Sequence, residues 1–172
     1  MFSPKEPFLE RGWPGRIDGE RVIQLAAQTL QAYFTGGGLA REHAEYPLAD
    51  VVFRAPVLHP PSVRLFDDEG DFVFANPAAI KAVGEDPAVS GAEPVERVAA
   101  IIGADGAIGG FTPFVEWIAP GLPGAKQRDF ALTLGPFVTT PDEEVPPGVD
   151  WEQLVAYAAE NTTLYPGDVI AA

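Results

Sequence analysis

The chain has 172 residues, of which 47% are hydrophobic, so it is long enough for one domain with an apolar core, or for a domain with a small lobe. Its formal net charge is −14 and it has no basic stripe, which argues against nucleic acids and anionic membranes as partners. It contains no cysteine, which excludes disulfides and thiolate chemistry, and no apolar run of the length that a secretory signal or a bilayer span requires, so we expect a cytoplasmic protein.

The N-terminal third is predicted to form a hairpin followed by a helix. Residues 15–25 read as two short strands around an Asp-Gly turn at Asp18. Residues 20–35 then place apolar side chains at helical spacing, and the three glycines at 36–38 are expected to end that helix. A short strand is expected at Val51–Phe53.

The middle of the chain is predicted to be rich in strands. Candidate strands occupy residues 70–77 and 95–103, and the segment 104–119 begins with a turn at Asp105-Gly106 and continues as a second apolar run. Residues 129–140 are predicted to form a further pair of strands with a corner between them. The segment 95–103 is almost continuously apolar, which is typical of a strand that is buried on both faces.

A second helix is predicted after Asp150, where Gln153 three residues on completes a capping-box pattern. Its apolar face would contain Trp151, Leu154, Val155 and Ala158. The helix is expected to end near Asn161, and a Pro-Gly turn leads into a final strand. The predicted class is therefore mostly β (α+β) with two main helices.

Six segments, in this order, resemble the fumarylacetoacetate hydrolase (FAH) family. They are PPSVRLF (60–66), VFANPAAI (73–80), VAAIIG (98–103), GFTPFVEWIA (110–119), AKQRDFALTLGPFVTTPDE (125–143) and WEQLVAYAAENTTLYPGDVI (151–170). The resemblance implies an FAH-like mixed, twisted β-sandwich or roll. It also implies a small N-terminal lobe at residues 1–58 and a catalytic-type core at 59–172 that is truncated relative to the family.

The resemblance further implies enzymes that act on small 2-oxo or 1,3-diketo acids with Mg²⁺ or Mn²⁺ held by carboxylates. The family's Glu-x-Glu pair matches Val95 and Arg97, its Asp before Trp matches Glu116, and its active-site lysine matches Arg128. The loop that carries the family's catalytic histidine has no counterpart. Only Asp68 and Glu116 are left as candidate metal ligands, so we predict that the metal site is lost and expect no metal cofactor.

Two interpretations of the cationic positions stay open. Arg97 and Arg128 either form structural ion pairs with nearby carboxylates, or they build a pocket that holds an organic acid. Glu116 is either a carboxylate at the surface or a retained functional group. The candidate residues are Glu116 and Arg128 for catalysis, and Arg97, Lys126 and Asp129 for ligand binding.

Two functions follow from these interpretations. The first is a non-hydrolytic role, either in binding a small organic acid or as an accessory or regulatory subunit. The second is a divergent hydrolase, lyase or isomerase for a small 2-oxo or 1,3-diketo acid. One version of this enzyme works without metal and uses Arg97, Arg128 and Glu116 instead. Since the family is typically dimeric and exposed sheet edges tend to be covered, we expect a homodimer or a heteromer with a full-length family member.

Overall fold

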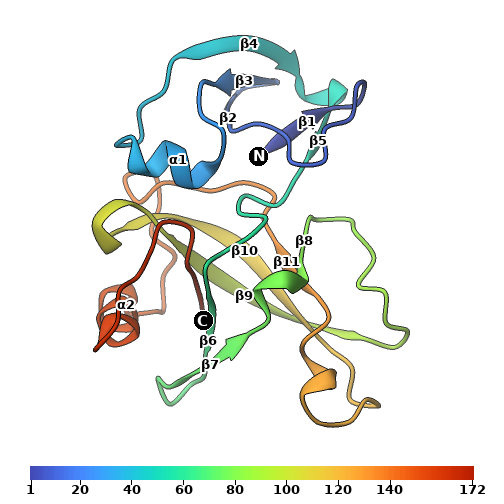
Figure 1. The fold of residues 1–172 in the computed structure, drawn as a ribbon, viewed down its shortest axis with the longest axis vertical. Helices are drawn as coiled ribbons and strands as arrows, with labels where there is room; N and C mark the ends of the chain where they lie inside the picture. Colours follow the sequence, from blue (N-terminus) through green and yellow to red (C-terminus); the bar gives the residue numbers. More distant parts are fainter.

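Three β-sheets and two α-helices make up the structure, a computed structural model that describes all residues from 1 to 172 (Figure 1). The N-terminal strands are β1 (Phe2–Pro4), β2 (Gly15–Asp18), β3 (Arg21–Leu25), β4 (Glu42–Pro47) and β5 (Val51–Phe53). The later strands are β6 (Val63–Phe66), β7 (Phe72–Ala75), β8 (Ile80–Lys81), β9 (Glu93–Ile102), β10 (Ile108–Ile118), β11 (Leu132–Leu134) and β12 (Val169–Ala171). The helices are α1 (Leu30–Thr35) and α2 (Trp151–Ala159).

The N-terminal strands form two small sheets above the large one in Figure 1. β1 pairs with β5, and β2, β3 and β4 form an antiparallel sheet in that order. The predicted hairpin at 15–25 is confirmed, because Asp18 pairs with Arg21 across a turn where Gly19 takes a φ of +56°. Glycine suits this turn because the left-handed region is unfavourable for other residues.

The predicted helix over residues 20–35 is largely wrong. Residues 21–25 belong to β3, which pairs with β2 on one side and β4 on the other, so its backbone groups are satisfied by the sheet. The helix is confined to α1, where the Thr29 side chain accepts a hydrogen bond from the N–H of Ala32. It ends at Thr35, with Gly36 as its C-cap, as the glycines predict.

The seven-stranded sheet has the order β7-β6-β12-β9-β10-β11-β8 and mixes parallel and antiparallel pairs. Its centre is the long β9–β10 hairpin, whose turn contains Asp105 and Gly106, both with positive φ. The strands predicted at 95–103 and 104–119 are therefore confirmed. The strand predicted at 70–77 is confirmed as the shorter β7, and the strand at Val51–Phe53 is confirmed as β5.

The segment 129–140 forms much less strand than predicted. Only Leu132–Leu134 pairs as β11, and the ladder stops at Gly135, which has a φ of +109° and is followed by Pro136. An isolated bridge between Phe111 and Thr139 then ties the segment back to β10.

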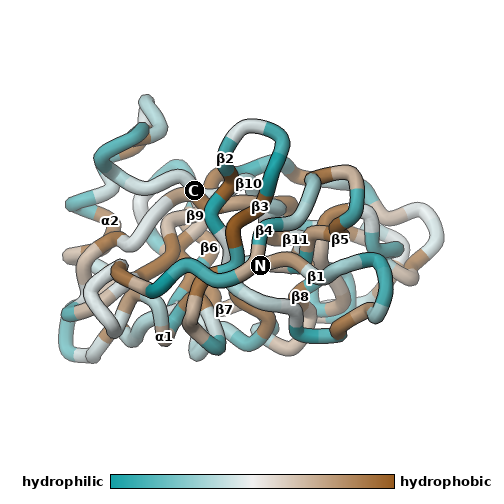
Figure 2. The backbone as a smooth tube through the Cα atoms, turned by 90° about the horizontal axis from the view of Figure 1, so that it is seen from above, coloured by the Kyte–Doolittle hydropathy of each residue, from teal (hydrophilic) through white to brown (hydrophobic).

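Both faces of the large sheet contribute buried side chains at its centre. Side chains that alternate along the strands form the main core on one face, with Ile101, Phe114, Leu132 and Val169 fully or almost fully buried. The opposite face packs under α2, where Trp151 contacts Phe111 at a ring-centroid distance of 5.1 Å. Figure 2 shows hydrophobic stretches in the strands at the middle of the molecule and hydrophilic stretches in many outer loops.

The α2 helix begins and packs as predicted. The Asp150 carboxylate accepts a hydrogen bond from the N–H of Gln153 at 3.0 Å, but the Gln153 side chain does not return one. The helix ends at Ala159, two residues before Asn161, which adopts a left-handed φ of +56°. The fold class is thus mostly β with two helices, as predicted. None of the helices has the length and apolarity that crossing a membrane would take. The lobe boundary at residue 58 stays a prediction.

Candidate functional site

The strand β10 holds Glu116 in the interior of the sheet. Glu116 lies opposite Val95 of β9 and Leu132 of β11, on the same face of the strand as Phe114. Its exposed fraction is 0%, so the interpretation of Glu116 as a surface carboxylate is wrong. A buried carboxylate is costly unless cations and hydrogen-bond donors compensate its charge.

Two guanidinium groups provide that compensation from different elements. Nη2 of Arg97, on β9, lies 3.4 Å from Oε2 of Glu116. Nε of Arg128, which follows the short 3-10 turn at Gly124–Gln127, lies 2.5 Å from Oε1. Both carboxylate oxygens are therefore engaged, and the three residues form an arginine–glutamate cluster (Arg97, Glu116 and Arg128) with a formal charge of +1.

The two arginines differ in how much of their bonding capacity the protein uses. The Arg97 side chain is 20% exposed, and it also donates from Nη1 to the carbonyl oxygen of Phe66 at 2.9 Å. The Arg128 side chain is 46% exposed, and only its Nε donates to a protein acceptor. The two terminal nitrogens of Arg128 therefore have no partner within the chain, and they belong to a side chain that is nearly half exposed.

The hydrogen bond to Glu116 also raises the pKa of Arg128 above its ordinary value. Arg128 is thus a permanent cation, and it cannot replace a lysine that exchanges protons.

Lys126 and Asp129 form a separate pair. Nζ of Lys126 lies 2.7 Å from Oδ2 of Asp129, and the Lys126 side chain is largely exposed. The backbone carbonyl of Asp129 accepts a hydrogen bond from Nδ2 of Asn76 at 2.9 Å. These contacts fix the loop that carries Arg128, but neither Lys126 nor Asp129 bonds to Glu116.

The residues at the positions of the family's metal ligands do not fit a divalent cation. Val95 offers no oxygen, Arg97 is cationic, and both oxygens of Glu116 already accept from guanidinium groups. Asp68 is an exposed residue of the turn between β6 and β7. No three His, Asp or Glu side chains of the chain are placed to hold a metal ion together.

A second buried arginine was missed by sequence reasoning. Arg64 on β6 is 4% exposed, donates to Oγ of Ser62 at 2.5 Å, and lies over the rings of Phe72 and Phe74. Ser62 in turn donates to buried Asp168 at 2.6 Å. The feature of the sequence that could have revealed this site is an arginine inside the otherwise apolar segment 63–66. Through Ser62 and Asp168, Arg64 links β6 to the turn before β12.

Solved structures provide the comparison for this geometry. No family model and no curated protein matches the sequence. Maleylpyruvate hydrolase from Sphingobium sp. SYK-6 is similar with a TM-score of 0.75 and 21% identity, over 99% of this chain and 87% of that one. The fold is FAH-like.

Two further FAH-like structures contain a metal and a small 2-oxo acid. Maleylpyruvate hydrolase in complex with manganese(II) and pyruvate has a TM-score of 0.73 at 21% identity, over 94% of this chain and 85% of that one. The 2-keto-3-deoxy-D-arabinonate dehydratase complexed with magnesium and 2,5-dioxopentanoate has a TM-score of 0.71 at 14% identity, over 99% of this chain and 85% of that one. At these identities the likeness establishes the FAH-like fold alone.

Proposed function

We propose that this FAH-like protein binds a small organic acid at the arginine–glutamate cluster without a divalent metal, and that it does not hydrolyse that acid. The main support for the proposal is the bonding of Glu116, whose two carboxylate oxygens each accept a hydrogen bond from an arginine. A metal-dependent site needs free carboxylate oxygens, whereas a site with a net positive charge attracts anions.

Arg128 is the group best placed to receive the acid. Its terminal nitrogens have no acceptor in the chain, and a carboxylate can bond to such a fork through both oxygens. Arg97, whose side chain is mostly buried, then adds positive charge that attracts the acid. Pyruvate is a suitable probe because it is the small acid bound in one of the similar structures.

Calorimetric titration with pyruvate in the presence of EDTA tests the proposal. We expect stoichiometric binding by the unmodified protein and binding that is at least about tenfold weaker in Arg128→Gln, since hydrogen bonds to charged groups contribute about 1.5–3 kcal/mol. Arg21→Gln is the matched control, because Arg21 pairs with Glu45 at the surface, away from the cluster. Equal affinities in all three proteins would refute the proposal.

A second titration, with Mg²⁺ and then Mn²⁺, tests the metal directly. We expect no stoichiometric binding of either ion to the unmodified protein. Binding of one ion per chain, accompanied by turnover of an acylpyruvate, would refute the proposal and favour a metal-dependent hydrolase.

An accessory or regulatory role is compatible with acid binding and would require that the chain associates with another protein chain. We propose that the chain forms a homodimer, or joins a full-length FAH-family enzyme. The support is β7, an edge strand of the large sheet on which Val73 and Phe74 are 54% and 67% exposed. Sedimentation analysis should detect a species heavier than the 18.3 kDa monomer, and a Phe74→Lys variant should shift it toward the monomer.

The alternative function is a metal-independent lyase or isomerase. It is favoured by the convergence of two guanidinium groups, which could stabilise an enolate, but the base role assigned to Glu116 requires that it first release a hydrogen bond. This function requires turnover of a 2-oxo or 1,3-diketo acid in EDTA that is abolished in Arg128→Gln. Binding without turnover favours the non-hydrolytic role.

A further inference from the structure

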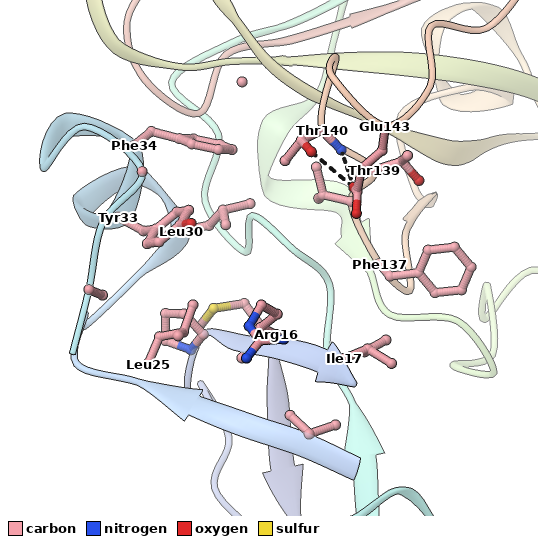
Figure 3. A pocket seen from close by; sticks show the side chains of 18 of the residues that line it. Arg16, Ile17, Leu25, Leu30, Tyr33, Phe34, Phe137, Thr139, Thr140 and Glu143 are labelled. Carbon is pink, nitrogen blue, oxygen red and sulfur yellow. Dashed lines mark hydrogen bonds between the residues drawn. The ribbon is translucent and has the colours of Figure 1, made fainter. Parts of the chain in front are cut away.

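A large groove separates the N-terminal part of the chain from the segment that follows β11 (Figure 3). Its volume is about 940 Å³, within the range of pockets that hold organic ligands. One wall comes from β2, β3 and α1, and the other comes from residues 136–144. We call it the N-terminal groove.

The N-terminal groove is distinct from the arginine–glutamate cluster. Gly109 at the start of β10 lines the groove, whereas Glu116 lies seven residues further along the same strand. At 3.3 Å per residue, these two positions are roughly 23 Å apart. Neither Arg97 nor Arg128 lines the groove.

Apolar side chains form much of the surface of the groove. Figure 3 shows Leu30 and Phe34 of α1 on one side, and Thr139, Thr140 and Glu143 on the other. Half of the lining residues, 13 of 26, are hydrophobic. Three of these hydrophobic lining residues are well exposed: Leu39 at 83%, Ile17 at 42% and Phe137 at 48%. A ligand with an apolar body would remove this surface from water.

The charges along the groove are mainly negative. Arg16 is the only lysine or arginine among the lining residues, and it is already paired with Asp18 and Glu42 at 3.4 and 2.7 Å. Asp142, Glu143 and Glu144 run along the opposite wall, and none of them has a cationic partner in the chain.

The position of this acidic segment is fixed by local hydrogen bonds. Glu143 accepts from the backbone N–H and the hydroxyl of Thr140 at 3.0 and 2.9 Å. One of its oxygens makes both bonds, so the other is free. The groove therefore presents an apolar surface beside excess negative charge, which disfavours carboxylates and favours cations.

We propose that the N-terminal groove binds an organic cation with an apolar body, of the class of primary alkylamines in their ammonium form. The alkyl body lies against Leu30 and Tyr33, which are both partly exposed, and the ammonium group lies beside Glu143 and Glu144. This site is independent of acid binding at the arginine–glutamate cluster, so either proposal can fail alone.

Three probes of equal chain length separate charge from apolar burial: octylammonium, octan-1-ol and octanoate, each titrated below its aggregation concentration and followed by protein NMR. We expect octylammonium to bind at least about tenfold more tightly than octanoate, with amide shifts at groove residues such as Tyr33 and Thr140. The ratio should fall between 0.05 and 1 M salt, because the charges of the acidic wall are exposed and salt screens them.

Two matched double variants test whether the carboxylates of the groove are the ones that attract octylammonium. Asp142→Asn/Glu144→Gln removes two exposed carboxylates of the groove and keeps Glu143, which holds the segment. Asp68→Asn/Glu69→Gln removes the same two residue types from an exposed turn that does not line the groove. We expect the first variant to lower the octylammonium-to-octanoate ratio about threefold or more, and the second to leave it unchanged.

Several results would overturn the proposal. They are the absence of octylammonium binding, binding of octanoate or octan-1-ol as tight as that of octylammonium, and equal effects of the two double variants.

Discussion

At the scale of single residues, the decisive feature is that a fully buried carboxylate is shared by two arginines. Glu116 has no contact with water, so its charge is tolerated only because Arg97 and Arg128 each bond to one of its oxygens. Arg97 in turn depends on Glu116, because its side chain is mostly buried and needs a counter-ion. Arg128 depends on Glu116 less, because water can solvate its more exposed side chain.

Removing this charge should be strongly destabilising. We expect Glu116→Gln to lower the free energy of unfolding by about 3–5 kcal/mol, because it leaves Arg97 buried without a counter-ion. Urea denaturation measures the change. Glu45→Gln is the control, since Glu45 and Arg21 are both more than half exposed, and it should cost less than about 1 kcal/mol. Equal losses in the two variants would contradict this account of the cluster.

The sequence identified the members of this cluster but not their environment. The resemblance to the FAH family pointed to Glu116, Arg97 and Arg128, and the structure brings the three together. The burial of Glu116 could not be read from the segment 110–119, because it depends on Leu132 of β11 and on the loop that carries Arg128. The N-terminal groove was not predicted either, since its walls are distant in sequence.

At the scale of elements, predictions succeeded where local signals and tertiary packing agree. The capping residue Asp150 precedes a helix whose Trp151 and Ala158 are buried against the large sheet. The helix prediction failed for residues 21–25, which the hairpin prediction placed correctly in a strand, because pairing on both edges of β3 outweighed the helical spacing of the apolar residues. The predictions also missed β4, because its residues are mostly polar or small and exposed, and lack the apolar alternation of a buried strand.

The cap of α2 offers a test at this scale. We expect Asp150→Ala to reduce the free energy of unfolding by about 1 kcal/mol, because the N–H of Gln153 loses its acceptor. Gln153→Ala should have a much smaller effect, since the Gln153 side chain makes no return bond and its backbone N–H is unchanged. Thermal unfolding of both variants measures the difference, and a larger loss for Gln153→Ala would show that the missing half of the capping box matters.

At the scale of the whole molecule, α1 is attached to the large sheet through an aromatic ring that lies on a glycine. Phe34 belongs to the main core, and its ring covers Gly109 of β10 so closely that an added Cβ would lie 2.7 Å from Cζ. This contact joins the N-terminal part of the chain to the central hairpin, so it also fixes one wall of the N-terminal groove.

A side chain at residue 109 should disturb this attachment. We expect Gly109→Ala to cost about 1–3 kcal/mol, because the Phe34 ring must move out of its packed position. Gly121→Ala is the matched control, since an added Cβ there meets no atom within 4 Å, and it should cause no loss. Urea denaturation of both variants decides the point, and an unchanged Gly109→Ala protein would mean that α1 is held by other contacts.

The arginine–glutamate cluster also limits the mutational routes that are open to this chain. A single Arg97→Glu change would place a second carboxylate next to Glu116, with only Arg128 to balance both. A single Val95→Glu change would likewise add charge to a position that faces Glu116 across the strands. Each step toward a carboxylate-rich site therefore passes through a destabilised intermediate, so a route to metal ligation is epistatic and requires several coordinated substitutions.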